Sequence, residues 1–149
     1  MREAISAGYK EALKARDQRR TATLRAVNAA IKDRDIEARG QGKGPLDEAA
    51  ILAMLQKMVK QREESFAIYA QAGRNDLATV EREEIEILNE FLPKALTDTE
   101  VDEAISAAIA KIGAAGAKDM GKVIAALKAD YPGRIDFGKA SAKVKAALG

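Results

Sequence analysis

The stretch FLPKALTDTE, residues 91–100, divides the chain into two helical parts. Pro93 has no backbone N–H and disfavours the α conformation at Leu92, so a helix that arrives from the N-terminal side ends there. Thr97 and Glu100 have the spacing of a capping box, in which each side chain accepts a hydrogen bond from the other residue's backbone N–H, so a new helix begins at Thr97. We therefore expect an N-terminal domain over residues 1–92 and a C-terminal domain over residues 93–149.

Apolar residues repeat at helical spacing on both sides of this boundary, and no segment alternates as a strand would. The N-terminal part predicts four helices, two of them capped by Asp17 and Asp47, with the third ending at Gly73. The C-terminal part predicts three shorter helices, the last capped by Asp136. The expected fold class is all-α, with N-terminal helical hairpins or a bundle followed by a small three-helix domain.

The composition excludes several kinds of site. The 149 residues include no cysteine and no histidine, which rules out disulfides, zinc sites built from those residues, cysteine nucleophiles and histidine bases. We expect no catalytic residues, no metal and no cofactor. Neither a signal peptide nor an apolar run of the ~18 residues needed for a membrane span is visible, so the sequence predicts a cytoplasmic protein.

Two charged clusters of the N-terminal domain have alternative interpretations. The fourth helix carries an acidic face, which we expect to lie in water and which could instead bind a metal, supply acid–base chemistry or meet a partner protein: Glu81, Glu83, Glu84, Glu86 and Glu90. An arginine-rich helix end near Asp17 is expected to be solvated, with a secondary anion-binding patch as the alternative: Arg16, Arg19, Arg20 and Arg25.

The positive excess lies in the last third of the chain. Residues 1–92 contain 16 basic and 16 acidic side chains, whereas residues 104–149 contain eight basic and three acidic ones, a difference of 8 − 3 = +5. Lys118 is predicted in the first turn of a helix, after Ala114–Ala117, which offer no side-chain cap, and Lys122 follows on the same face. A helix start of this kind, with free N–H groups and nearby cations, suits an anion.

Glycines paired with cations flank the predicted last helix, as Gly133-Arg134 and Gly138-Lys139. Solvated lysines beside turn glycines are one interpretation of this pattern, and contact with nucleic acid is the other. Since only Tyr131 and Phe137 are aromatic in this part, base stacking on single strands is disfavoured, and recognition of a folded RNA through its backbone fits better.

Four blocks of the sequence resemble the GatB/YqeY family, and within it the stand-alone YqeY-like proteins: Leu55–Arg62, Ala72–Arg74, Glu90–Lys94 and Lys118–Val123. The resemblance extends along nearly the whole chain. It implies an all-helical protein whose C-terminal part is similar to the tail domain of the B subunit of the Asp-tRNA/Glu-tRNA amidotransferase. That enzyme belongs to carbon–nitrogen ligation with glutamine as amido donor, but its catalytic parts have no counterpart in this chain.

The resemblance further implies a tRNA-binding or tRNA-associated accessory protein of translation. The predicted contact residues are Lys118, Gly121, Lys122, Gly133, Arg134, Gly138, Lys139 and Lys143. The alternatives are a protein–protein adaptor that docks on an aminoacyl-tRNA synthetase or amidotransferase, and an auxiliary component of amide transfer.

Overall fold

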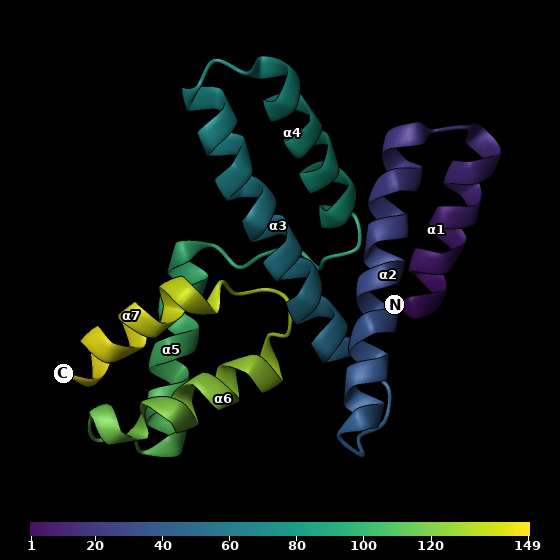
Figure 1. The fold of residues 1–149 in the computed structure, drawn as a ribbon. Coiled ribbons are helices and arrows are strands. Elements are labelled where there is room, and N and C mark those ends of the chain that lie inside the picture. The colour runs from purple at the N-terminus through teal and green to yellow at the C-terminus, as the bar shows by residue number, and fades with distance from the viewer. The chain divides into compact units, whose positions relative to one another are not determined.

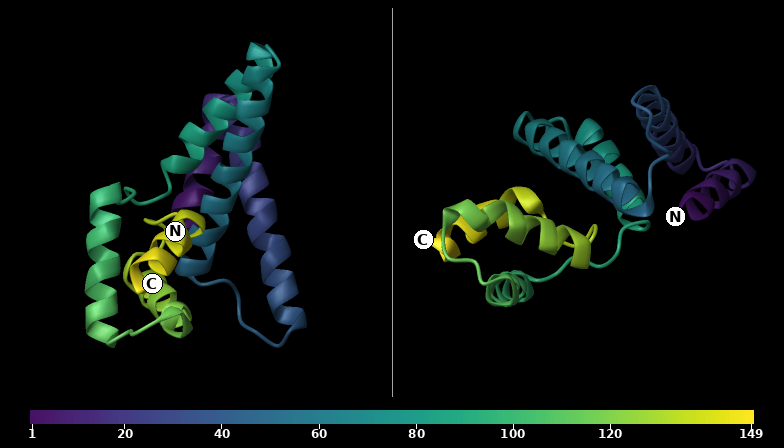
Figure 2. Two further views of the ribbon diagram at one scale, coloured as in Figure 1. Left: turned by 90° about the vertical axis from the view of Figure 1, so that its left-hand side faces the viewer. Right: turned by 90° about the horizontal axis from the view of Figure 1, so that it is seen from below.

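The computed structural model describes all 149 residues and contains helices and turns but no strand, which confirms the predicted all-α class. The chain forms two compact units, Met1–Leu92 and Pro93–Gly149 (Figures 1 and 2). The structure has seven α-helices and one 3-10 turn: α1 Arg2–Ala15, α2 Gln18–Gly40, α3 Glu48–Gln71, α4 Asn75–Asn89, α5 Asp98–Ile112, η1 Ala117–Asp119, α6 Met120–Asp130 and α7 Phe137–Leu148.

The N-terminal unit consists of two helical hairpins, α1–α2 and α3–α4, which meet where α2 packs on α4 (Figure 1). One continuous apolar core joins them: Ile5, Val27, Ile31, Ile51, Met54, Leu55, Val59 and Leu88. At the end of α4 the Phe91 ring covers Gly8 of α1. A Cβ atom at Gly8 would lie only 3.2 Å from the ring, so this close approach depends on glycine.

The C-terminal unit packs α5, α6 and α7 around a second, separate core. Its buried members come from all three helices and from the turn before α7: Val101, Ala104, Ile105, Val123, Leu127, Ile135, Ala140 and Val144. Five of these eight residues are valine or alanine. Small side chains let the three short helices approach closely.

Helix boundaries follow the predicted signals at most positions. Asp17, Asp47 and Asp136 accept hydrogen bonds from the first turns of α2, α3 and α7. Thr97 and Glu100 form the complete capping box, with both hydrogen bonds 3.1 Å long. Gly73 and Gly113 follow the ends of α3 and α5 with positive φ angles. The sequence predicts this role for Gly73.

Two boundaries differ from the sequence predictions. The helix expected to reach Leu92 ends at Asn89, and the last three residues before Pro93 form tighter i→i−3 hydrogen bonds. Such tightening is common at helix ends, where carbonyl groups lack i+4 partners. Lys118 does not lie in the first turn of a helix, because α6 begins only at Met120 and Lys118 occupies the preceding 3-10 turn.

Candidate nucleic-acid interface

Three lysines among the predicted contact residues are exposed: Lys118 and Lys122 at the start of α6, and Lys139 at the start of α7. Lys118 is exposed and forms no ion pair. Lys122 has 73% of its side chain exposed, and its Nζ atom lies 3.9 Å from Asp119 Oδ1, so this pair is loose. Between them Gly121 is exposed and has open space where a Cβ would be, which means that packing does not require glycine there. The start of α6 is therefore accessible to a large partner.

No side chain caps the first turn of α6, as the alanine and glycine residues before it predict. The nearest carboxylate, Asp119, instead accepts a hydrogen bond of 3.0 Å from the Ala115 N–H in the preceding turn. Backbone N–H groups at a helix start, with lysine side chains beside them, attract anions.

The start of α7 is different, because its own aspartate already occupies it. Asp136 Oδ1 accepts hydrogen bonds from the N–H groups of Gly138, at 2.9 Å, and Lys139, at 3.4 Å. The backbone groups that the sequence offered to a phosphate therefore bind a carboxylate within the chain. What remains for a partner at this position is the exposed ammonium group of Lys139.

Arg134 has a structural contact that the sequence did not reveal. Its Nε donates to the carbonyl oxygen of Lys94 at 2.9 Å, and its own carbonyl accepts from the Leu96 N–H, also at 2.9 Å. Gly133, directly before it, is buried with φ 75°. These hydrogen bonds hold the segment after Pro93 against the turn that leads into α7.

Lys143 is paired with the acidic start of α5. Its Nζ lies 3.0 Å from Asp102 Oδ1 and 4.0 Å from Asp98 Oδ1, and only about a third of the side chain is exposed. The fold thus places an acidic helix beside the basic segment. Over the whole unit, residues 93–149, nine basic and seven acidic side chains leave 9 − 7 = +2, which is less than the +5 counted for residues 104–149 alone.

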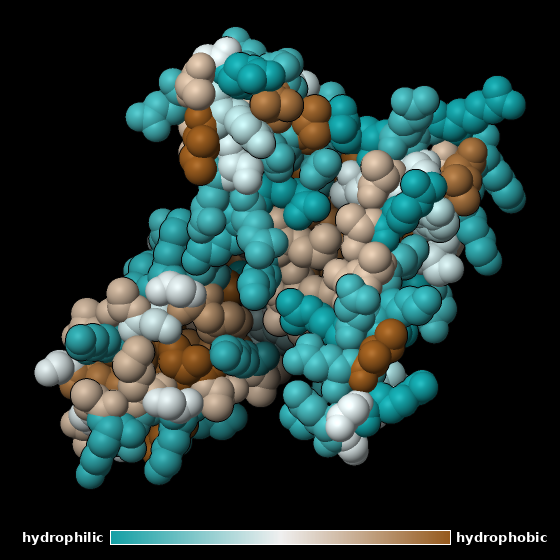
Figure 3. Space-filling view, in the orientation of Figure 1, coloured by the Kyte–Doolittle hydropathy of each residue, from teal (hydrophilic) through white to brown (hydrophobic).

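The eight predicted contact residues do not form one cluster. Lys118, Gly121 and Lys122 lie at the start of α6, whereas Gly133–Lys139 follow its end. An α-helix of 11 residues is about 16 Å long, which separates the two groups. In Figure 3, hydrophilic side chains project at the lower left from a surface otherwise made of small and apolar residues. A partner that contacts both groups must therefore be extended.

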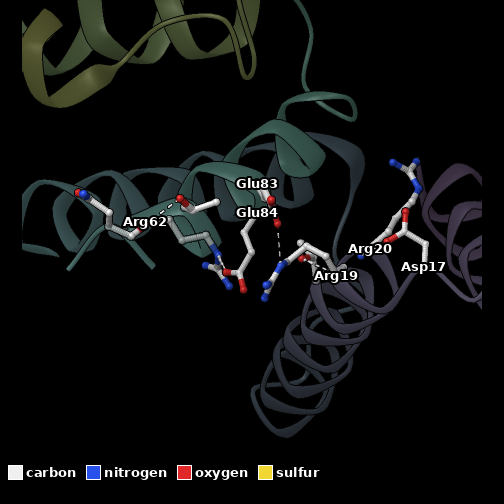
Figure 4. Close-up of polar contacts among 9 residues, drawn as sticks. Asp17, Arg19, Arg20, Arg62, Glu83 and Glu84 are labelled. Atoms are coloured by element: carbon white, nitrogen blue, oxygen red, sulfur yellow. Dashed lines mark hydrogen bonds and ion pairs between the residues drawn. The ribbon is translucent and has the colours of Figure 1, made fainter. Parts of the chain in front are cut away.

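The acidic face of α4 is not simply solvated, contrary to expectation. Two of its glutamates bind arginines of other helices, Glu83 with Arg19 at 3.0 Å and Glu84 with Arg62 at 2.7 Å (Figure 4). Glu90, directly after α4, pairs with Arg20. The same pairs engage half of the arginine cluster near Asp17. The pairs Glu83–Arg19 and Glu90–Arg20 thus hold the two hairpins of the unit together, whereas Glu84–Arg62 joins α4 to α3 within one hairpin.

Burial and the neighbouring carboxylate of Glu84 raise the pKa of Glu81 on this helix. No group of three or more acidic side chains is arranged to hold a metal ion. No helix is both long and apolar enough to cross a membrane.

Comparison with known proteins places residues 2–148 within the family described as Yqey-like protein. Three relatives carry the name "Altered inheritance of mitochondria protein 41, mitochondrial". The protein of Lachancea thermotolerans is 32% identical over 99 residues, covering 65% of this chain and 51% of the relative. The protein of Kluyveromyces lactis is 32% identical over 105 residues, covering 68% and 55%. The protein of Vanderwaltozyma polyspora is 27% identical over 118 residues, covering 74% and 62%. The chain spans about half to three-fifths of their length.

Proposed function

The chain belongs to the YqeY family, as its sequence blocks predict, and we propose that it is a tRNA-associated accessory protein that binds folded RNA through its C-terminal unit. The observation that carries this proposal is the pair Lys118 and Lys122, which are exposed in the 3-10 turn before α6 and in the first turn of α6 and have no close ion pair. A cation that is exposed and unpaired contributes little to folding and is free to neutralise a phosphate.

The surroundings of these lysines favour an RNA backbone over exposed bases. The unit has no exposed aromatic side chain: Tyr131 and Phe137 are partly buried and pack on its core. Stacking on unpaired bases needs such side chains, whereas contact with phosphates needs only cations and N–H groups. The resemblance of this unit to the amidotransferase tail makes tRNA the RNA to test first.

A tRNA titration with matched variants tests the proposal. If the contact at the C-terminal unit neutralises about three phosphates, it contributes about −2.7 to the slope of log K against log salt, which alone lowers affinity about 40-fold between 50 and 200 mM salt. K118E/K122E should lose most of this binding. K10E/K14E is the control, since it changes two exposed lysines of α1, also four residues apart, by the same charge. Equal affinities for the two variants would refute the assignment.

The cytoplasmic location predicted from the sequence belongs to the same proposal. Its alternative comes from the relatives, whose names describe them as mitochondrial. Cell fractionation with an antibody against the native chain distinguishes the two locations, because a protein confined to mitochondria would leave the cytosolic fraction empty.

A further inference from the structure

The outer face of α2 carries three evenly spaced cations that form no ion pair within the fold and take no part in the proposed contact at α6. Arg25, Lys32 and Arg39 are all exposed and follow one another at intervals of seven residues. Seven residues are close to two helical turns, so the three side chains lie along one side of the helix, about 10.5 Å apart and about 21 Å from end to end. We call these three residues the α2 ridge.

The ridge lies away from the core of the N-terminal unit. Leu24, Val27 and Ile31, which are buried, face the other helices. The positions beside the ridge residues on the outer face are mostly small or neutral, including Ala22, Ala29 and Ile36, and all three are exposed. Hydrophilic side chains dominate the surface over the C-terminal half of α2 in Figure 3.

The ridge cations form no ion pair, although α2 contains several carboxylates. Side chains three or four positions apart are neighbours on a helix, and among these neighbours only Asp35 is acidic, next to both Lys32 and Arg39. Asp35 is engaged elsewhere. Its Oδ1 atom lies 2.8 Å from an Arg2 nitrogen and 2.9 Å from the Leu46 amide nitrogen, and its Oδ2 atom lies 2.9 Å from the other terminal nitrogen of Arg2. Asp35 still interacts electrostatically with Arg39, but no carboxylate forms an ion pair with a ridge cation.

One ridge residue is also oriented by a neighbouring helix. The Arg25 Nε lies 3.4 Å from the Tyr9 hydroxyl oxygen of α1 and donates to it. This contact engages Nε alone. The two terminal nitrogens make no hydrogen bond, so the edge of the guanidinium that suits bidentate contact with a phosphate is free.

We propose that the α2 ridge is a second contact surface for the phosphate backbone of a folded RNA. Three cations spread over about 21 Å match an extended polyanion, whereas a small anion would meet only one of them. A protein partner fits less well, because interfaces between proteins centre on buried aromatic or apolar anchors and this face offers only Ile36. This inference rests on the proposed function, since it assigns a second surface to the same class of ligand.

Neutral substitutions in the intact chain test the ridge. R25Q/K32Q/R39Q removes three charges and keeps good helix formers, and K10Q/K14Q/K57Q removes three exposed lysines elsewhere in the same unit. With a tRNA probe, the ridge variant should lower the magnitude of the salt slope by about 2.7, equivalent to about 500-fold weaker binding at 0.1 M salt. The control should bind at least tenfold more tightly than the ridge variant.

The outcomes separate this inference from the proposed function. If K118E/K122E loses tRNA binding while R25Q/K32Q/R39Q matches its control, the ridge is overturned and the α6 contact stands. If the ridge variant loses binding and K118E/K122E does not, the ridge stands and the α6 contact fails. Competition by polyglutamate as effective as competition by RNA, at equal charge concentration, would overturn the ridge in favour of an acidic protein partner.

Discussion

In the N-terminal unit, arginine and carboxylate side chains connect one helix to another, whereas in the C-terminal unit most lysines connect to nothing. Arg2, Arg19, Arg20 and Arg62 each bind a carboxylate on a different helix from their own. In the second unit only Lys143 does so. The difference matches the residue types, since the planar guanidinium group holds a carboxylate in fixed geometry and the flexible lysine ammonium does not. The first unit therefore uses much of its charge for contacts between helices, whereas most lysines of the second unit stay unpaired.

Truncating one core leucine in each unit should have the largest effect and tests whether the units are separate. Leu88 and Leu127 are 0% and 1% exposed, so Leu88→Ala and Leu127→Ala should each cost about 2–5 kcal/mol. The second unit has 149 − 92 = 57 residues, which corresponds to a total stability of about 3–9 kcal/mol. In L127A, amide hydrogen exchange should rise across residues 93–149 alone. A rise along the whole chain would contradict independent units.

Breaking the Arg62–Glu84 pair should have the next largest effect. Both side chains are about four-fifths buried, and Arg62 also donates to the Met58 carbonyl. Glu84→Gln leaves the guanidinium without its counter-charge and should destabilise the unit by about 1–3 kcal/mol in urea denaturation, with an unchanged m-value. Glu86→Gln, at an exposed glutamate of the same helix with no ion pair, is the control and should stay within about 0.5 kcal/mol.

Removing the Arg134 side chain should have a smaller effect. It should lower the stability of the C-terminal unit more than its affinity for tRNA. Arg134→Gln loses the hydrogen bond to the Lys94 carbonyl, a net cost of about 1 kcal/mol in the C-terminal unit. Its tRNA affinity should fall much less than that of K118E/K122E. Unchanged stability together with an equal loss of affinity would instead make Arg134 a direct RNA contact.

The smallest effect on stability concerns Asp35, and this effect is lost in acid. Hydrogen bonds from Arg2 and from the Leu46 amide lower the pKa of Asp35 from 3.8 to about 2. A carboxyl whose pKa is lower in the folded chain stabilises the fold above its ordinary pKa, and this contribution is lost as the pH falls from about 4 to about 2. In thermal denaturation, the midpoint of Asp35→Asn should lie below that of the wild type at pH 5, and the gap should close by pH 2. A gap independent of pH would contradict the assignment.

The helices and their ends could be predicted because their signals are local. Pro93, the capping aspartates and the Thr97–Glu100 box act within one helical turn, so the sequence alone places them. The separation into two units follows the same stretch. The exact end of α4 and the 3-10 turn at Lys118 could not be predicted. Both depend on which N–H groups donate hydrogen bonds to the carbonyl groups at the end of a helix or in a turn.

The use of the charged residues could not be predicted, because it depends on contacts between distant segments. Glu83 and Arg19 are 64 residues apart in the chain, and Arg134 and Lys94 are 40 apart. Spacing along one helix shows that a glutamate lies on the side opposite the buried residues of that helix. It does not show that another helix places an arginine next to that glutamate. The same limit applies to the candidate site, where the acidic start of α5 lies beside Lys143 although 41 residues separate Asp102 from it.

The hydrogen bonds between Arg134 and the segment after Pro93 bear on how this unit could be exchanged between proteins. Residues 94–96 lie outside every helix, yet their carbonyl and N–H groups bind the turn before α7 and so belong to the second unit. A gene fusion whose transferred segment began at Thr97 would lose these hydrogen bonds. A segment that began at Pro93 would keep them. The proline thus marks the position at which recombination can transfer this module intact.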